Sequence, residues 1–123
     1  MPITYKIDQD SGIYHERWVG EIQPLEMGQH WMALMNDPNY QDIELCIADI
    51  REASLVFTSR ELWNTVDDFF REIHGSKVIR VAVLVTNVLQ EQAARKWISI
   101  VPLSVSAGIF YDGGQAEKWL TSG

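Results

Sequence analysis

The run from Val78 to Val85 restricts the fold of this chain more than any other segment. Arg80 is its only polar residue, and most of the others are β-branched. A short, continuously apolar run of this kind is typical of a strand that is covered on both faces, as in parallel sheets. A shorter run, Leu45–Ala48, comes earlier in the chain. Together the two runs predict the buried centre of a parallel sheet, which needs helices on its faces.

The segments around these runs predict the order ββαβαβαβα. Ile3–Asp8 alternates apolar and polar residues, and Asp10-Ser11-Gly12 is a short turn that joins it to a second strand, Ile13–Val19. Apolar stripes and cap residues predict four helices, over residues 24–35, 58–74, 88–100 and 115–120. A less strongly apolar run predicts a last strand over residues 105–111. We therefore predict an α/β fold with a mainly parallel sheet and an antiparallel first strand.

Length and charge exclude several classes of function. A chain of 123 residues is the size of one domain, so we expect a single domain over residues 1–123. The formal net charge is −7, and Lys and Arg form no cluster, which argues against nucleic acid and anionic membrane surfaces as partners. No apolar stretch approaches the roughly 20 residues of a membrane span, and the N-terminus lacks the features of a signal peptide. The single cysteine, Cys46, fits a reducing compartment, and we expect a cytoplasmic protein.

Three segments carry a family resemblance. They are the opening segment Ile3–Asp8, the strand end Ala48-Asp49-Ile50-Arg51, and a terminal strand and helix over 109–112 and 116–120. In these segments and in the order of its elements the chain resembles the STAS/SpoIIAA-like family, most closely the small stand-alone bacterial SpoIIAA-like proteins. The resemblance implies a single SpoIIAA-like domain, related to the lipid-carrying SEC14 fold.

Ser59 is the phosphosite candidate that this resemblance implies. In the anti-anti-sigma branch of the family, a serine at the start of the second long helix is phosphorylated. The matching stretch here is Phe57-Thr58-Ser59-Arg60-Glu61, in which Thr58 and Glu61 replace the Asp and Gly of the usual motif. The same residues also read as a capping box, in which the Thr58 hydroxyl and the Glu61 carboxylate bind free backbone N–H groups.

Polar side chains follow the predicted parallel strands. Asp49 and Arg51 come after Leu45–Ala48, Asn87 comes after the next strand and Asp112 after the last one. Because ligands of open α/β sheets bind outside the carboxyl ends of the strands, these four residues are candidates for a small polar binding cleft. The alternative is structural: Asp49 accepts bonds from loop N–H groups and pairs with Arg51.

Two helices have more apolar surface than one stripe requires. Trp63 and Phe70 lie seven residues apart on the second helix, on a face offset from its inner stripe, and Ile98 lies on a second stripe of the third helix. A wide core, a homodimer surface or the wall of an apolar pocket would each explain this surplus. Trp63, Phe70 and Ile98 are therefore our interface candidates.

No group of residues predicts catalysis. His15, His30 and His74 lack metal-ligand spacing, and no phosphate-binding loop or nucleophile elbow is present, so we expect no metal, no cofactor and no enzymatic activity. The leading hypothesis is a binding or regulatory module that acts through protein contact, as a homodimer. The alternative is a carrier of a small apolar, lipid-like ligand between sheet and helices. A third hypothesis is an enzyme that uses Asp49, Arg51 and Asn87 around a small anion.

Overall fold

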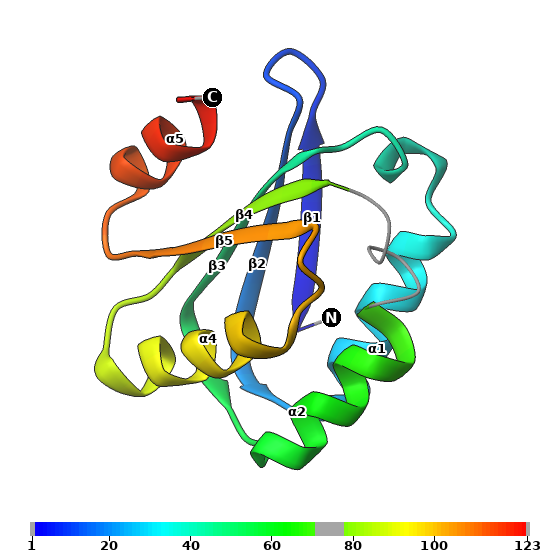
Figure 1. Cartoon of the computed structure of the whole chain (residues 1–123), viewed down its shortest axis with the longest axis vertical. Helices are drawn as coiled ribbons and strands as arrows, with labels where there is room; N and C mark the ends of the chain where they lie inside the picture. Colours follow the sequence, from blue (N-terminus) through cyan, green and yellow to red (C-terminus); the bar gives the residue numbers. More distant parts are fainter. Residues whose placement is uncertain (1, 71–77, 123) are drawn as a thin grey trace.

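A five-stranded sheet forms the centre of the molecule in the computed structural model, which describes residues 2–70 and 78–122 (Figure 1). Its strands lie in chain order: β1 (Ile3–Asp8), β2 (Ile13–Ile22), β3 (Leu45–Leu55), β4 (Ile79–Leu84) and β5 (Val105–Phe110). β1 pairs with β2 in antiparallel fashion, and the three other pairings are parallel. This confirms the predicted α/β class, the element order and the antiparallel first strand. The β1–β2 turn needs Gly12, whose φ is +72°.

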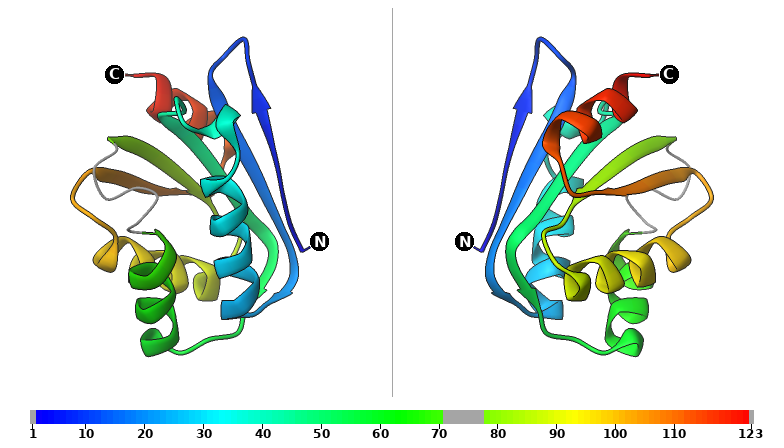
Figure 2. Two further views of the ribbon diagram at one scale, coloured as in Figure 1. Left: turned by 90° about the vertical axis from the view of Figure 1, so that its right-hand side faces the viewer. Right: turned by 90° about the vertical axis from the view of Figure 1, so that its left-hand side faces the viewer.

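The helices divide between the two faces of the sheet. α1 (Pro24–Met35), α2 (Ser59–Thr65) and α4 (Val88–Ile100) cover one face, which we call the helical face, whereas α5 (Gly113–Thr121) packs on the other, the α5 face (Figure 2). A short 3-10 helix, η1 (Pro38–Tyr40), follows α1, and a π-helix, η2 (Val66–Phe70), continues α2. The larger core lies on the helical face and contains the buried thiol of Cys46.

β2 and β3 are longer than the sequence predicted. They pair with one another from Ile13 and Leu45 as far as Ile22 and Leu55, beyond the apolar runs from which we predicted them. A strand can continue through polar residues when a neighbouring strand satisfies its backbone groups, which local patterns do not reveal. Asp49 and Arg51 therefore lie inside β3 and not in a loop at its end, which corrects our prediction.

The second predicted helix changes its geometry after Thr65. The π-helix η2 has more residues per turn than an α-helix, so the inward face advances along the sequence. Phe70 thereby reaches the core, where it is 4% exposed. Our prediction for the end of this helix, which included Ile73, His74 and Gly75, lies outside the described residues.

No helix in the described ranges combines the length and the apolar character that a membrane-spanning segment requires.

Candidate functional site

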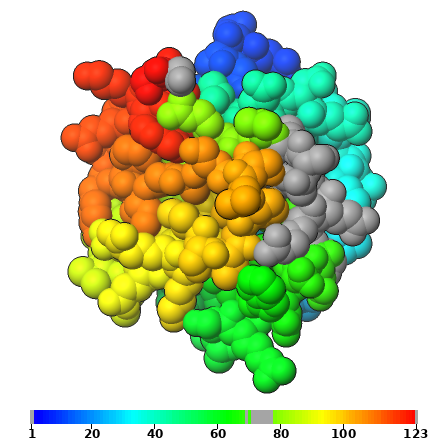
Figure 3. All heavy atoms as spheres, in the orientation of Figure 1, coloured from blue at the N-terminus to red at the C-terminus, as the bar shows by residue number. Residues whose placement is uncertain are grey.

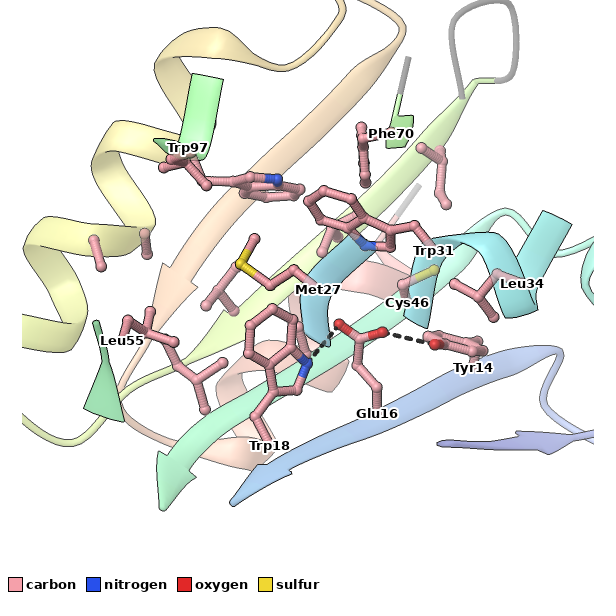
Figure 4. Close-up of a pocket in the computed structure, with 18 of the residues that line it drawn as sticks. Tyr14, Glu16, Trp18, Met27, Trp31, Leu34, Cys46, Leu55, Phe70 and Trp97 are labelled. Carbon is pink, nitrogen blue, oxygen red and sulfur yellow. Dashed lines mark hydrogen bonds between the residues drawn. The ribbon is translucent and has the colours of Figure 1, made fainter. Parts of the chain in front are cut away.

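A cavity of about 70 Å³ lies between the sheet and the helices of the helical face (Figure 4). About 10–15 Å³ of such space holds one water molecule, so the cavity has room for a group of several heavy atoms. Side chains from β2, β3, β4, α1, α2, η2 and α4 line it. They are almost all apolar or aromatic, and they include Trp18, Met27, Trp31, Leu34, Cys46, Leu55, Leu62, Phe70, Val83, Ala94 and Trp97.

Glu16 is the one acidic side chain among the described residues that line this cavity. It lies on β2 between Tyr14 and Trp18, and because side chains alternate along a strand, all three point to the helical face. The Glu16 side chain is only 10% exposed. His30 of α1, also buried, reaches it from the opposite layer, with Nε2 2.7 Å from Glu16 Oε2.

The hydrogen bonds of this cluster fix the position of the His30 proton. The Tyr14 hydroxyl donates to Glu16 Oε2 at 2.6 Å, and the Trp18 indole donates to Oε1 at 3.0 Å. A carboxylate can only accept, so His30 Nε2 must carry a proton and donate it to Glu16. The same Nε2 lies 3.1 Å from the Tyr14 hydroxyl oxygen, so the His30 N–H forms a bifurcated hydrogen bond to Glu16 and Tyr14. Three donors therefore hold one buried carboxylate.

These contacts decide the charge of Glu16. Burial by itself raises the pKa of a carboxyl group, but the charge of His30 and the bonds from His30, Tyr14 and Trp18 outweigh it and hold the pKa of Glu16 below its usual value. Burial, followed by the nearby Glu16 charge, raises the pKa of Tyr14 far above the usual value. The cluster is thus an ionised carboxylate beside a phenol that stays protonated.

Sequence reasoning missed this cluster, although part of its signal was present. Tyr14, Glu16 and Trp18 recur with period two, which places a carboxylate on an otherwise aromatic strand face. A buried carboxylate needs a partner, and His30 lies next to Trp31 on the inner stripe of the first helix. Only the packing of α1 against β2 shows that the two residues meet.

A more polar groove of about 310 Å³ adjoins the cavity between α2 and α4, which lie next to one another at the surface (Figure 3). The groove and the cavity share the side chains of Leu55, Phe57, Leu62 and Ala93, so the two spaces are separated only by this common wall. Lys96 is the only charged side chain that lines the groove within the described residues. We call this space the α2–α4 groove.

The predicted polar cleft forms only in part. Arg51 binds Asp49 through two side-chain bonds of 3.0 and 2.9 Å, and both residues line a groove on the α5 face. The charge of Asp112 also acts on Arg51. Asn87, however, lines the α2–α4 groove on the opposite face. The reason is that Asn87 begins α4 and Asp112 begins α5, and these two helices cover opposite faces of the sheet.

The local contacts of Asp49, Asn87 and Asp112 are those expected of residues that stabilise the fold rather than bind a ligand. Asp49 accepts the backbone N–H of Arg51 at 3.1 Å as well as its guanidinium. Burial raises the pKa of Asp49, but the bonds and the charge of Arg51 outweigh it, so the pKa lies below its usual value. Asn87 and Asp112 each accept a backbone N–H in the first turn of the helix that they cap. Their role in binding a ligand stays a prediction.

Ser59 is exposed at the first residue of α2. The predicted capping box is confirmed, since Thr58 Oγ1 accepts from Glu61 N at 3.1 Å and a Glu61 carboxylate oxygen accepts from Thr58 N at 2.7 Å. This contact explains the motif around Ser59 without a phosphate. Phosphorylation of Ser59 stays a prediction.

The three interface candidates occupy different environments. Trp63 is 45% exposed, and Ile98 is partly buried. Phe70 is buried and contacts Trp31 edge-to-face, with the ring centroids 4.9 Å apart. The prediction that Phe70 contributes to an interface is therefore wrong in this conformation, because the π-helix turns the residue inward.

Within the described ranges, no three His, Cys, Asp or Glu side chains are grouped so that they could bind a metal ion.

The chain is similar to one solved structure over nearly its whole length. That structure is described as an uncharacterized protein from the DUF3478 family with a SpoIIAA-like fold, from Shewanella loihica PV-4. The two chains superpose with a TM-score of 0.66 at 24% identity, and the match covers 96% of this chain and 91% of the other. This chain has the SpoIIAA-like fold. No model of a known protein family matches the sequence, and no curated protein does.

The SpoIIAA-like fold by itself does not assign a function to the cavity. Folds are shared by proteins with unrelated functions, so a function must be argued from the side chains of the site. In this SpoIIAA-like chain, the helical face combines a cavity, a buried ion pair and an adjoining groove.

Proposed function

We propose that this chain is a non-enzymatic binding protein that holds a small, mainly apolar ligand in the cavity of the helical face. The observation that carries the proposal is the cavity itself, which has about 70 Å³ of free space and an almost wholly apolar wall. Protein interiors are normally packed as densely as organic crystals, so free space of this size in a small core calls for an explanation. A bound ligand supplies one.

Filling the cavity would be favourable. An atom beside empty space lacks dispersion contacts on one side, and a ligand that fits the space restores them. Burial of apolar ligand surface contributes about 25 cal/mol per Å². The lining is also stiff and aromatic, with Trp18, Trp31, Phe70 and Trp97 around one space, so little side-chain entropy is lost on binding.

The α2–α4 groove offers the most direct route to the cavity. The side chains of Leu55, Phe57, Leu62 and Ala93 line both spaces, and small rotations of such side chains could open or close a path. Both α2 and α4 are surface helices. We place the protein in the cytoplasm, because a chain with the single, buried cysteine Cys46 cannot form an internal disulfide, which fits a reducing compartment.

Filling the cavity from the protein side tests the proposal. Ala94 of α4 lines the cavity and is 4% exposed. We expect Ala94→Leu to occupy the free space and weaken the binding of a small apolar ligand at least about tenfold. Native mass spectrometry of the purified protein detects a ligand that co-purifies, and thermal shift with short-chain apolar compounds measures binding of added ones.

The matched control is Val88→Leu. Val88 lies on the same helix, is 62% exposed and is absent from the cavity wall. This control should bind like the wild-type protein. If no short apolar compound raises the melting temperature of the wild-type protein, or if Ala94→Leu and Val88→Leu bind equally well, the proposed function is wrong.

Contact with a second copy of the chain is the second candidate function, and the exposure of Trp63 supports it. An indole that is 45% exposed is a common anchor of protein interfaces. We expect the wild-type chain to form a homodimer and Trp63→Ala to shift it toward the monomer. Size-exclusion chromatography with light scattering measures both, and a wild-type chain that stays monomeric at high concentration would exclude this candidate.

A further inference from the structure

The indole N–H of Trp97 is a buried hydrogen-bond donor without an acceptor. Within the described part of the chain, Trp97 Nε1 is the one buried side-chain nitrogen or oxygen that lacks a partner. The contrast with Trp18 is clear, because the Trp18 indole donates to Glu16 at 3.0 Å. Buried polar groups are nearly always paired, and an unpaired one costs free energy. The described residues thus leave a buried donor without an acceptor, which a ligand could supply.

Trp97 lies in the wall of the cavity. It projects from α4, and its ring packs edge-to-face against Phe70 with centroids 5.5 Å apart and an interplanar angle of 85°. Figure 4 shows the indole extending over the cavity toward Trp31 and Phe70. The ring is held between these neighbours, so the donor is fixed in position before a ligand arrives.

The rest of the wall restricts the acceptor to an uncharged group. Glu16 already places one negative charge at the cavity, and its partner His30 is engaged with it. Among the described residues that line either space, the one basic side chain is Lys96, which belongs to the α2–α4 groove. Inside the cavity, a ligand carboxylate would be a second buried anion, and the described lining residues offer it no cation, which is strongly unfavourable.

We propose that Trp97 determines ligand specificity by donating its indole N–H to the oxygen of a neutral carbonyl compound with short apolar substituents, such as a ketone, ester or amide. The inference rests on the proposed function, since it names the ligand class of the same cavity. The carbonyl oxygen accepts the bond that no atom of the described residues accepts, and the apolar substituents fill the remaining space. A pure hydrocarbon of the same shape would fill the space but leave the donor unpaired.

A pair of isosteric probes tests the inference. Methyl propyl ketone is compared with the alkene in which a methylene group replaces the oxygen. We expect the ketone to bind the wild-type protein about tenfold more tightly than the alkene. In proton–nitrogen NMR spectra, the ketone should move the Trp97 indole N–H signal downfield, as hydrogen bonding does, and the alkene should not. The Trp18 signal should stay where it is, because its bond to Glu16 is already formed.

Two variants complete the test. Trp97→Phe keeps an aromatic ring but removes the donor, so the two probes should then bind within about twofold of one another. Trp119→Phe removes an indole on the α5 face, outside the cavity, and should keep the preference for the ketone. The indole signal of the wild-type protein provides a readout that does not depend on the folding of either variant.

The outcomes separate the two proposals. If both probes bind wild-type protein equally and the Trp97 signal does not move, the specificity inference is wrong and the proposed function stands. If neither probe binds, both are wrong. A ketone preference that persists in Trp97→Phe would also overturn the inference, because another group would then be the donor.

Discussion

Replacing His30 with leucine is expected to lower the free energy of unfolding at neutral pH by about 3–5 kcal/mol. The substitution removes the His30 donor from Glu16 but leaves the carboxylate buried between Tyr14 and Trp18. An unpaired charge in such a place costs far more than the loss of an exposed ion pair. Urea unfolding followed by tryptophan fluorescence measures the difference.

The pH dependence of the free energy of unfolding provides a more specific test of this prediction. In the wild-type protein the pKa of Glu16 lies below its usual value of 4.5, so Glu16 contributes stability above that pH and loses it as the pH falls through the lower folded-state pKa. Without His30, burial dominates and the pKa of Glu16 should rise. The contribution of Glu16 then reverses: it favours the folded state at low pH and is lost as the pH increases toward neutral.

The control is the double variant Glu16→Gln/His30→Leu, which removes the titrating carboxyl group. Other carboxyl groups, such as Asp49, titrate in both variants, so their contribution cancels in the comparison. His30→Leu should approach or exceed the stability of the double variant at acidic pH and fall below it at neutral pH. Parallel stability curves, or a loss below about 1 kcal/mol in His30→Leu, would contradict the assignment of Glu16 as a buried anion that needs His30.

The second large effect is expected at Trp31, which forms part of the cavity wall. Trp31 is 4% exposed and contacts Phe70 edge-to-face. We expect Trp31→Ala to lower the free energy of unfolding by about 3–5 kcal/mol, because it removes buried surface and enlarges the cavity. Trp31→Phe, which keeps a ring in the same place, should cost clearly less and guards against a variant that fails to fold.

Trp31→Ala should also change the size of the preferred ligand. An apolar ligand that fills the enlarged cavity stabilises the folded state by an amount that grows with the logarithm of its concentration relative to Kd, about 2.7 kcal/mol at a hundred times its Kd. Larger compounds, such as those with an aromatic ring, should therefore raise the melting temperature of Trp31→Ala more than that of the wild-type protein. An equal shift in both proteins would show that the ligand binds elsewhere.

The candidate site was only partly accessible from the sequence. The pairing of Asp49 with Arg51 follows from local spacing, since residues two apart on a strand share a face, and the structure contains it. The prediction that Asn87 lies beside them was wrong, because it assumed that α4 and α5 begin at the same edge and face. Which face a crossover helix covers depends on packing between layers, and no pattern around Asn87 records it.

Phe70 is a second residue whose environment could not be predicted from local sequence patterns. An α-helical pattern placed it with Trp63 on a face offset from the inner stripe and left its burial open, whereas in the structure Phe70 ends a π-helix and lies in the core. In the core its ring contacts Trp31 and Trp97 edge-to-face, and both partners lie on other helices. Local sequence patterns therefore did not predict that the helix changes to π geometry before Phe70.

The sequence by itself determined the α/β class, the order of the elements, the antiparallel first strand and the helix caps. These features depend on periodicity, turns and caps, which involve residues only a few positions apart. The cavity, the contact of Glu16 with His30 and the unpaired donor of Trp97 were decided only by the tertiary structure. Each depends on how β2, α1 and α4 fit together, and imperfect fit between distant surfaces is what leaves both the free space and the unmet hydrogen bond.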